Sequence, residues 1–139
     1  MKKILLLIFV SITLGCSKDP ETFMIHLEGY WEIDEVTLSD GSKRDYRFNN
    51  TIDYIEVSDS LTGTRRKLKP NLLGKYETSK SVESFHIKLE NDSLNIYYKT
   101  PYANWKETVL NATENELLII NNTNKDMYLY RRYEPLDLD

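Results

Sequence analysis

Cysteine occurs only once in the 139 residues of this chain, at position 16, so no disulfide can form within it. Histidine occurs twice, as His26 and His86, and neither lies in an HExxH pattern, a metal-ligand spacing or the context of a nucleophilic serine. The sequence therefore predicts no metal site, no cofactor and no catalytic residue, and we expect that the protein is not an enzyme. Its stability must come from burial of the 40% of residues that are hydrophobic.

The chain also has no apolar run long enough to span a bilayer, because a transmembrane helix needs about 20 predominantly apolar residues. Its longest apolar stretch, residues 4–14, follows Lys2 and Lys3 and ends at Gly15. A basic start, a short apolar stretch and a small residue at the end are typical of a secretory signal peptide. We therefore predict a signal peptide over residues 1–15.

The cysteine that follows this segment makes it resemble a bacterial lipoprotein signal, in which the cysteine becomes the lipid-modified first residue of the mature chain. One departure is Thr13, which stands where this signal usually has leucine. The resemblance implies lipid attachment at Cys16, a membrane as partner and a location in the cell envelope, at the outer membrane with a periplasmic or surface-facing orientation. The alternative is an ordinary cleaved signal that leaves a free thiol.

Basic residues are too few to balance the acidic ones, with 18 against 22 and a formal net charge of -4. Loss of Lys2 and Lys3 with the leader would make the mature chain more acidic still. A negative protein repels phosphate, so we expect no nucleic-acid partner. The remainder contains no linker-like, repetitive or low-complexity segment, and its length suits one domain.

The start of the mature chain predicts a short helix over residues 20–28. Asp19 and Pro20 are typical of an N-cap and a first helical residue, and Gly29 is typical of a helix stop. Residues 16–28 are therefore interpreted as a lipidated tether followed by this helix.

After the helix, short runs rich in β-branched and aromatic residues alternate with clusters of turn-forming residues. Several runs have one apolar face, which favours an antiparallel up-and-down meander. Closure removes exposed strand edges, so we predict an all-β fold, a small barrel of about 8–10 strands over residues 29–134, followed by an acidic tail at 135–139. The predicted strands cover residues 30–38, 43–48, 52–58, 64–69, 74–78, 82–90, 94–100, 105–110, 117–121 and 127–133.

In this chain a short helix is followed by Gly29-Tyr30-Trp31, which opens the first strand, and by a meander that ends in "YLYRRY". This arrangement resembles the lipocalin-like domains of Bacteroidota lipoproteins and, more distantly, lipocalins proper. The resemblance covers essentially the whole mature chain. It implies that Gly29 and Trp31 lie at a closed barrel floor, and that an arginine of the last strand lies across the indole.

The arginine of this floor is predicted from strand alternation. Arg131 shares the parity of the apolar residues Met127 and Leu129, so we expect Arg131 to stack on Trp31; Arg132 is the alternative.

The ten tyrosines suit either the lining of a ligand pocket or the filling of a barrel interior. We predict that Tyr76, Tyr98 and Trp105, which lie near strand ends, line a pocket. Arg66, which shares the face of Leu68, is predicted to line the same pocket, and inside a barrel it would need a buried anionic partner.

Two carboxylates and one basic strand face leave further alternatives open. Asp53 and Glu107 fall in phase with apolar neighbours, which fits either a buried acid/base pair or a position on a sheet edge or exposed face. Arg65, Lys67 and Lys69 share the other face of the Arg66 strand, which is interpreted as a solvated surface or as a site for an anionic partner.

These patterns favour a cell-envelope lipoprotein whose lipocalin-like barrel binds or carries a small amphipathic or hydrophobic molecule. The alternative is a non-catalytic accessory or assembly protein that uses the barrel surface to bind another envelope protein.

Overall fold

The described part of the chain begins with a short helix, α1 (Glu21–Leu27). In the computed structural model, residues 18–135 are described, so the predicted signal peptide, Cys16 and most of the predicted tail lie outside them. The side chain of Asp19 accepts a hydrogen bond from the amide of Glu21 at 3.0 Å, which satisfies one free N–H group at the helix start. Within residues 18–135, no helix is both long and apolar enough to cross a membrane.

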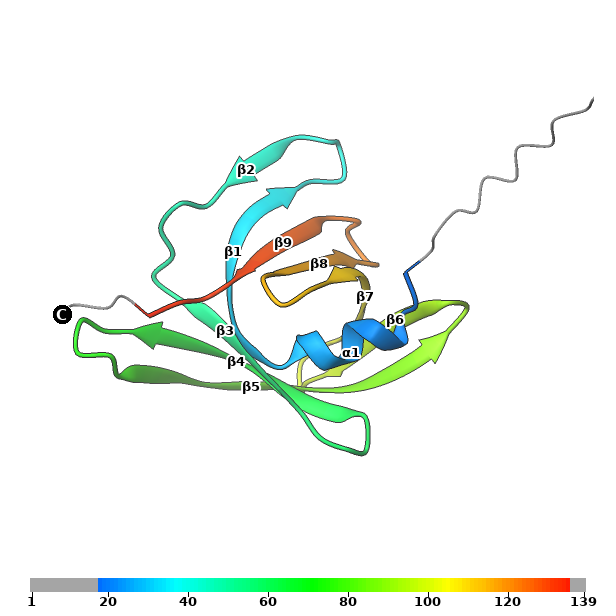
Figure 1. The fold of residues 1–139 in the computed structure, drawn as a ribbon, viewed down its shortest axis with the longest axis horizontal. Helices are drawn as coiled ribbons and strands as arrows, with labels where there is room; N and C mark the ends of the chain where they lie inside the picture. Colours follow the sequence, from blue (N-terminus) through cyan, green and yellow to red (C-terminus); the bar gives the residue numbers. More distant parts are fainter. Residues whose placement is uncertain (1–17, 136–139) are drawn as a thin grey trace, which may run out of the picture.

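Nine strands follow, and all pair in one antiparallel sheet in the order β2-β1-β3-β4-β5-β6-β7-β8-β9 (Figure 1). A further pairing between β1 and β9 closes eight of them into a barrel, and β2 is an extra strand beside the end of β1. The strands are β1 (Gly29–Thr37), β2 (Lys43–Asp45), β3 (Ile52–Val57), β4 (Thr62–Pro70), β5 (Tyr76–Glu90), β6 (Ser93–Lys99), β7 (Asn104–Ala112), β8 (Glu116–Asn121) and β9 (Met127–Arg132). The predicted all-β barrel with a short N-terminal helix is confirmed.

One difference from the predicted strands lies in β5. The sequence predicts two strands, 74–78 and 82–90, but the chain runs through the "SKS" segment between them as one strand. Arg66 pairs with Val82 and Leu68 pairs with Thr78, so the surplus residues of β5 are absorbed in a bulge. The small polar residues therefore mark an irregularity within a strand and not its end.

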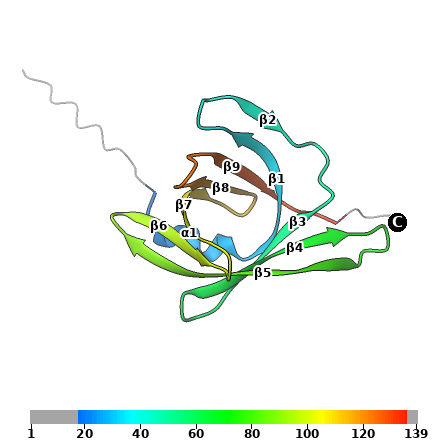
Figure 2. The ribbon, with the colours of Figure 1, turned by 180° about the vertical axis from the view of Figure 1, so that it is seen from behind.

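The two ends of the barrel differ. At one end, where β1 begins and β9 ends, α1 lies across the barrel and contacts β3 and β7 (Figures 1 and 2). We call this the closed end. The opposite end, called the mouth, carries the β2–β3 connection and the β6–β7 turn, whereas the β4–β5 hairpin protrudes sideways from the barrel, with its tip beside the end of β9.

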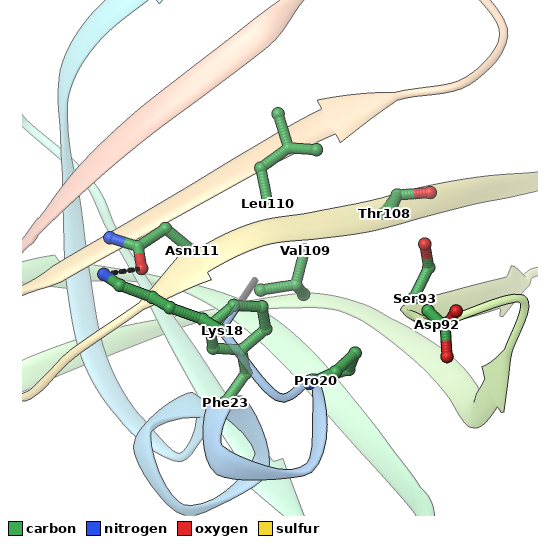
Figure 3. Close-up of a pocket in the computed structure, with 9 residues that line it drawn as sticks. All are labelled: Lys18, Pro20, Phe23, Asp92, Ser93, Thr108, Val109, Leu110 and Asn111. Atoms are coloured by element: carbon green, nitrogen blue, oxygen red, sulfur yellow. Dashed lines mark hydrogen bonds between the residues drawn. The ribbon is translucent and has the colours of Figure 1, made fainter. Parts of the chain in front are cut away.

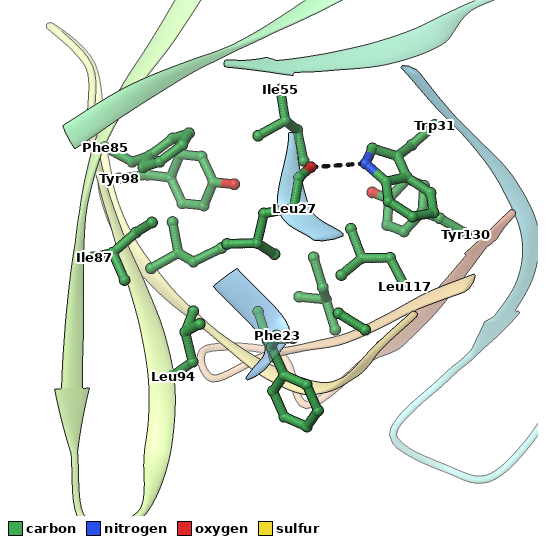
Figure 4. Packing of buried hydrophobic residues seen from close by; sticks show 14 residues of the cluster. Phe23, Leu27, Trp31, Ile55, Phe85, Ile87, Leu94, Tyr98, Leu117 and Tyr130 are labelled. Atoms are coloured by element: carbon green, nitrogen blue, oxygen red, sulfur yellow. Dashed lines mark hydrogen bonds between the residues drawn. The ribbon is translucent and has the colours of Figure 1, made fainter. Parts of the chain in front are cut away.

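The hydrophobic core fills the barrel beneath the helix (Figure 4). Phe23 and Leu27, one helical turn apart, reach into it from α1 and are 5% and 0% exposed. The barrel wall contributes Trp31, Ile55, Phe85, Ile87, Leu94, Ile96, Tyr98, Val109, Ala112, Leu117, Ile119 and Tyr130. Most of these residues alternate along their strands, as expected for a sheet with one buried face.

Candidate functional site

The closed end is built around Trp31, which is completely buried. Its indole nitrogen donates a hydrogen bond to the carbonyl oxygen of Leu27 at 2.9 Å, which ties the first strand to the end of α1. The guanidinium of Arg132 lies 3.7 Å from the centre of the indole ring. Arg132 also donates to the carbonyls of His26, Glu28 and Glu114, at 3.0, 2.8 and 2.8 Å. It therefore satisfies carbonyl groups that the helix end leaves free.

The same contact accounts for Gly29. Its φ of +131° lies in a region that L side chains rarely adopt, and a Cβ atom at this position would collide with the guanidinium of Arg132. The glycine is therefore needed for the close approach of the arginine as well as for the change from helix to strand.

The prediction that Arg131 covers the indole is wrong, and the alternative, Arg132, takes that place. Arg131 lies on the outer face, where it forms ion pairs with Glu32 at 2.7 Å and Asp34 at 2.6 Å. The face of β9 that points inward carries Tyr128 and Tyr130, not the apolar Met127 and Leu129. The prediction placed the more apolar face of this strand inside the barrel. It is wrong because amphipathic tyrosines, on the other face, fill this part of the interior.

Between this floor and the mouth, the barrel encloses a charged and aromatic cluster centred on Arg65. Its Nε donates to Glu83 at 2.7 Å and its Nη1 to Glu107 at 3.2 Å. Its guanidinium also lies 4.5 Å from the ring centre of Tyr98. Burial disfavours the charged form of Arg65, but neighbouring Tyr98 and Glu107 favour it, and the pKa of Arg65 lies well above its usual range. Arg65 is thus a permanent cation inside the barrel.

Aromatic rings form the other half of this cluster. Tyr98 and Trp105 stack with ring centres 4.8 Å apart, and the indole nitrogen of Trp105 lies 3.3 Å from a carboxylate oxygen of Glu107. The Tyr98 hydroxyl points into the barrel interior (Figure 4) and has no hydrogen-bond partner among the described residues. Burial raises the pKa of Tyr98 well above its usual range, so the hydroxyl keeps its proton.

A second ion pair lies beside the first. Asp53, only 4% exposed, accepts a hydrogen bond at 2.8 Å from the ammonium group of Lys67, whose side chain is 57% exposed. Burial, followed by the charge of Asp53, raises the pKa of Tyr130 well above its usual range. The buried carboxylate is therefore part of the barrel interior, and its lysine partner reaches it from solvent. We call Arg65, Asp53, Lys67, Glu83, Glu107, Tyr98 and Trp105 the inner cluster.

Two of the four predicted pocket residues lie in the inner cluster and two do not. Tyr98 and Trp105 are members. Arg66 instead lies on the outer face of β4, opposite Tyr54, because its neighbour Arg65 pairs with the inward-pointing Ile55. The prediction that places Arg66 inside with Leu68 is therefore wrong.

Tyr76, the fourth predicted pocket residue, lies outside the barrel. It stacks on Tyr30 with ring centres 5.3 Å apart, and Tyr30 stacks on Tyr54 at 4.7 Å. Tyr133 meets Tyr76 edge-on at 6.5 Å. These rings pack β1, β3 and the β4–β5 hairpin together on the outer surface.

Sequence reasoning missed the central member of the cluster. Arg65 was interpreted as part of a solvated strand face, although Asp53 and Glu107 were in phase with apolar residues. These two carboxylates could have indicated that Arg65 points inward. A buried carboxylate needs a cation nearby, and a facing strand can supply it. Each has its own cation, Lys67 for Asp53 and Arg65 for Glu107.

Two hollows of the described part of the chain open on the surface near the closed end. The larger, with a volume of about 400 Å³, lies between the start of α1 and strands β6 and β7, and Lys18 donates a hydrogen bond to Asn111 beside it (Figure 3). The other, of about 360 Å³, lies beside Arg131 and Arg132.

Over residues 18–135, no three His, Cys, Asp or Glu side chains are grouped so as to hold a metal ion. His26 lies on α1 and His86 on the outer face of β5, so neither belongs to the inner cluster.

An eight-stranded antiparallel barrel with a helix across one end and a tryptophan sealed beneath it defines the class of small lipocalin-like barrels. The family described as "Lipocalin-like domain" matches residues 27–119, and the chain belongs to this family. Among solved structures, the chain is similar to a lipocalin-like protein from Bacteroides uniformis, with 10% sequence identity and a TM-score of 0.47, over 78% of this chain and 99% of the other. Among curated proteins, none matches the sequence.

Proposed function

We propose that this lipocalin-like protein is a non-catalytic carrier or sensor in the cell envelope that binds one small amphipathic molecule through the mouth of its barrel. The polar head of the molecule would meet the inner cluster. Its apolar part would lie along Ile33, Trp105 and Tyr128, which are partly buried against the core. Barrels of this size hold at most one small ligand.

The observation that carries this proposal is the inner cluster itself. A barrel built only for stability gains nothing from buried ions, because well-packed apolar residues of similar volume stabilise as well or better. Here Glu107 and Arg65 are 6% and 12% exposed in their side chains, and the Tyr98 hydroxyl has no hydrogen-bond partner within residues 18–135. Polar groups that converge inside an otherwise apolar enclosure are the usual arrangement of a small-molecule site.

The proposal predicts a fluorescence response that depends on one of the two tryptophans. Trp105 contacts the inner cluster and is partly exposed, whereas Trp31 is sealed at the closed end. Titration with single-chain amphiphiles should therefore change the tryptophan emission of the wild-type protein, and the change should disappear in Trp105→Phe. A response that persists unchanged in Trp105→Phe, or no response to any amphiphile, would contradict the proposed site.

The envelope location rests on the predicted lipid anchor at Cys16. The described chain begins at Lys18, which is bonded to Asn111 at the closed end. Two residues span at most about 7 Å, so an anchor at Cys16 would attach at the closed end and leave the mouth pointing away from that membrane.

We expect Cys16→Ser to move the protein from the membrane fraction to the soluble fraction and to remove the mass of the acyl groups from the mature chain. Fractionation and intact-protein mass spectrometry measure both. Ser17→Ala, one residue further on, is the matched control and should stay in the membrane fraction. An unmodified Cys16 in the wild-type protein would disprove the anchor.

A second candidate function is supported by exposed apolar residues around the mouth. Phe48 and Tyr102 on two mouth connections are 95% and 97% exposed, and Leu72 and Leu73 at the tip of the β4–β5 hairpin, which protrudes sideways, are 81% and 82% exposed. Such residues are typical of a surface that binds another protein. If the amphiphile titrations give no response, docking of an envelope protein at the mouth becomes the better proposal.

A further inference from the structure

The charge balance of the inner cluster indicates which kind of head group it can accept. Three carboxylates, from Asp53, Glu83 and Glu107, face only two cations, Arg65 and Lys67. A ligand carboxylate or phosphate would add a fourth anion to this enclosure and would have to displace an existing one. A ligand cation that takes the place of an existing one would leave this balance unchanged, and charges interact more strongly here than in water.

The hydrogen-bonding groups lead to the same conclusion. An ammonium group presents three donors and no acceptor. The cluster offers carboxylate oxygens on Asp53 and Glu107, both at most 5% exposed, together with the unpartnered oxygen of the Tyr98 hydroxyl. Tyr98 is itself only 2% exposed, and Figure 4 shows its hydroxyl pointing into the barrel. The Arg65 guanidinium over the Tyr98 ring shows that a cation is stable against these aromatic faces.

Lys67 already places an ammonium group in this site. Its Nζ lies 2.8 Å from the buried Asp53 carboxylate, although most of the lysine side chain is in solvent. Lys67 is also the residue at which β4 and β5 lose their regular register, between Arg66 and Leu68. An exposed stem on an irregular strand position lets the lysine swing out of the site without disturbing the core.

We propose that the inner cluster is a site for the positively charged nitrogen of an amine, and that Lys67 occupies it until a ligand amine replaces the lysine on Asp53. This inference rests on the proposed function and adds the chemical class of the ligand. The ligand is an amphipathic primary amine, with its ammonium on Asp53 in the place of the Lys67 ammonium and its apolar part toward the mouth. Lys67 then acts as an internal competitor, which lowers the apparent affinity of the empty protein for its ligand.

The first test uses three amphiphiles with the same tail, dodecylamine, dodecanol and dodecanoate, titrated into the purified wild-type protein with Trp105 emission as the readout. We expect the amine to bind about tenfold more tightly than the other two, and raised salt to reduce this difference. Equal binding of all three would overturn the amine specificity and leave the proposed function standing. Binding by none of them would overturn both.

A control is needed because the whole protein is acidic and attracts cations to its surface. Asp53→Asn and Glu56→Gln remove the same charge from the same strand, but Asp53 points into the barrel and Glu56 is exposed. The amine preference should disappear in Asp53→Asn and persist in Glu56→Gln. Equal loss in both variants would show that the amine binds the general surface charge, which overturns the proposal.

The second test is chemical rescue of a vacated site. Lys67→Ala should bind dodecylamine about tenfold more tightly than the wild type, because the internal competitor is gone. Butylamine, which matches the lost lysine side chain, should also raise the melting temperature of Lys67→Ala, whereas butanol and butyrate should not. Adding Asp53→Asn should abolish this rescue. Weaker amine binding in Lys67→Ala, or rescue by butyrate, would contradict the proposal.

Discussion

Trp31→Ala is expected to lower the free energy of unfolding by about 3–5 kcal/mol, which is the usual effect of truncating a large buried aromatic side chain. The indole is 0% exposed, it bonds to the last carbonyl of α1 and it carries the Arg132 guanidinium on its face. Its loss therefore opens a cavity at the point where helix, first strand and last strand meet. Chemical denaturation followed by circular dichroism would measure the change, and the melting temperature should fall by about 10–20 °C.

Two matched comparisons make this result specific. Tyr102→Ala also removes a large aromatic side chain, but one that is 97% exposed, and it should change stability by less than about 0.5 kcal/mol. Arg132→Ala should destabilise clearly more than Arg131→Ala, because Arg132 satisfies three carbonyls and Arg131 holds only half-exposed ion pairs worth about 0–1 kcal/mol. The reverse order would mean that the floor is wrongly assigned.

Arg65→Ala is expected to lower the free energy of unfolding by an amount comparable to that of Trp31→Ala, but for an electrostatic reason. It leaves Glu107, whose side chain is 6% exposed, and Glu83 without their cation. Removing one partner of a buried ion pair typically destabilises by about 3–5 kcal/mol, because the remaining charge stays buried without compensation. The expected result is a large loss of unfolding free energy in urea.

The neighbouring arginine provides the control. Arg66→Ala makes the same substitution one position along β4, but on the outer face, and we expect an effect of less than about 1 kcal/mol. A double variant, Arg65→Met with Glu107→Gln, removes charge from both partners and should recover part of the lost stability. Equal effects of Arg65→Ala and Arg66→Ala would show that the inner cluster does not exist as described.

The class of fold could be predicted from the sequence because it depends on local patterns. Short alternating runs bounded by turn formers predict paired strands, and the "DP" and Gly29 signals bound α1 almost as the structure has it. The tryptophan after Gly29 was correctly expected to be buried at a barrel end. Within β5, however, the break predicted between residues 78 and 82 is instead a bulge, since only the partner strand decides whether surplus residues break the pairing.

Less of the inner cluster could be predicted from the sequence. Tyr98 and Trp105 were expected near a pocket, but Arg66 and Arg131 were each chosen in place of the neighbour that points inward. Alternation by itself says which residues share a face, not which face is inside. Where tyrosines and ion pairs fill the interior, the more apolar face is not the inner one, as β9 shows with Tyr128 and Tyr130.

What the sequence by itself determined is the succession of strands and turns and the helix that precedes them. Each of these follows from interactions between residues close together in the chain. Only the tertiary structure decided which arginine covers Trp31, and that Arg65 and Lys67 meet Glu83, Glu107 and Asp53 inside the barrel. Those contacts join strands distant in sequence, and their register is set by barrel closure and bulges that no local pattern specifies.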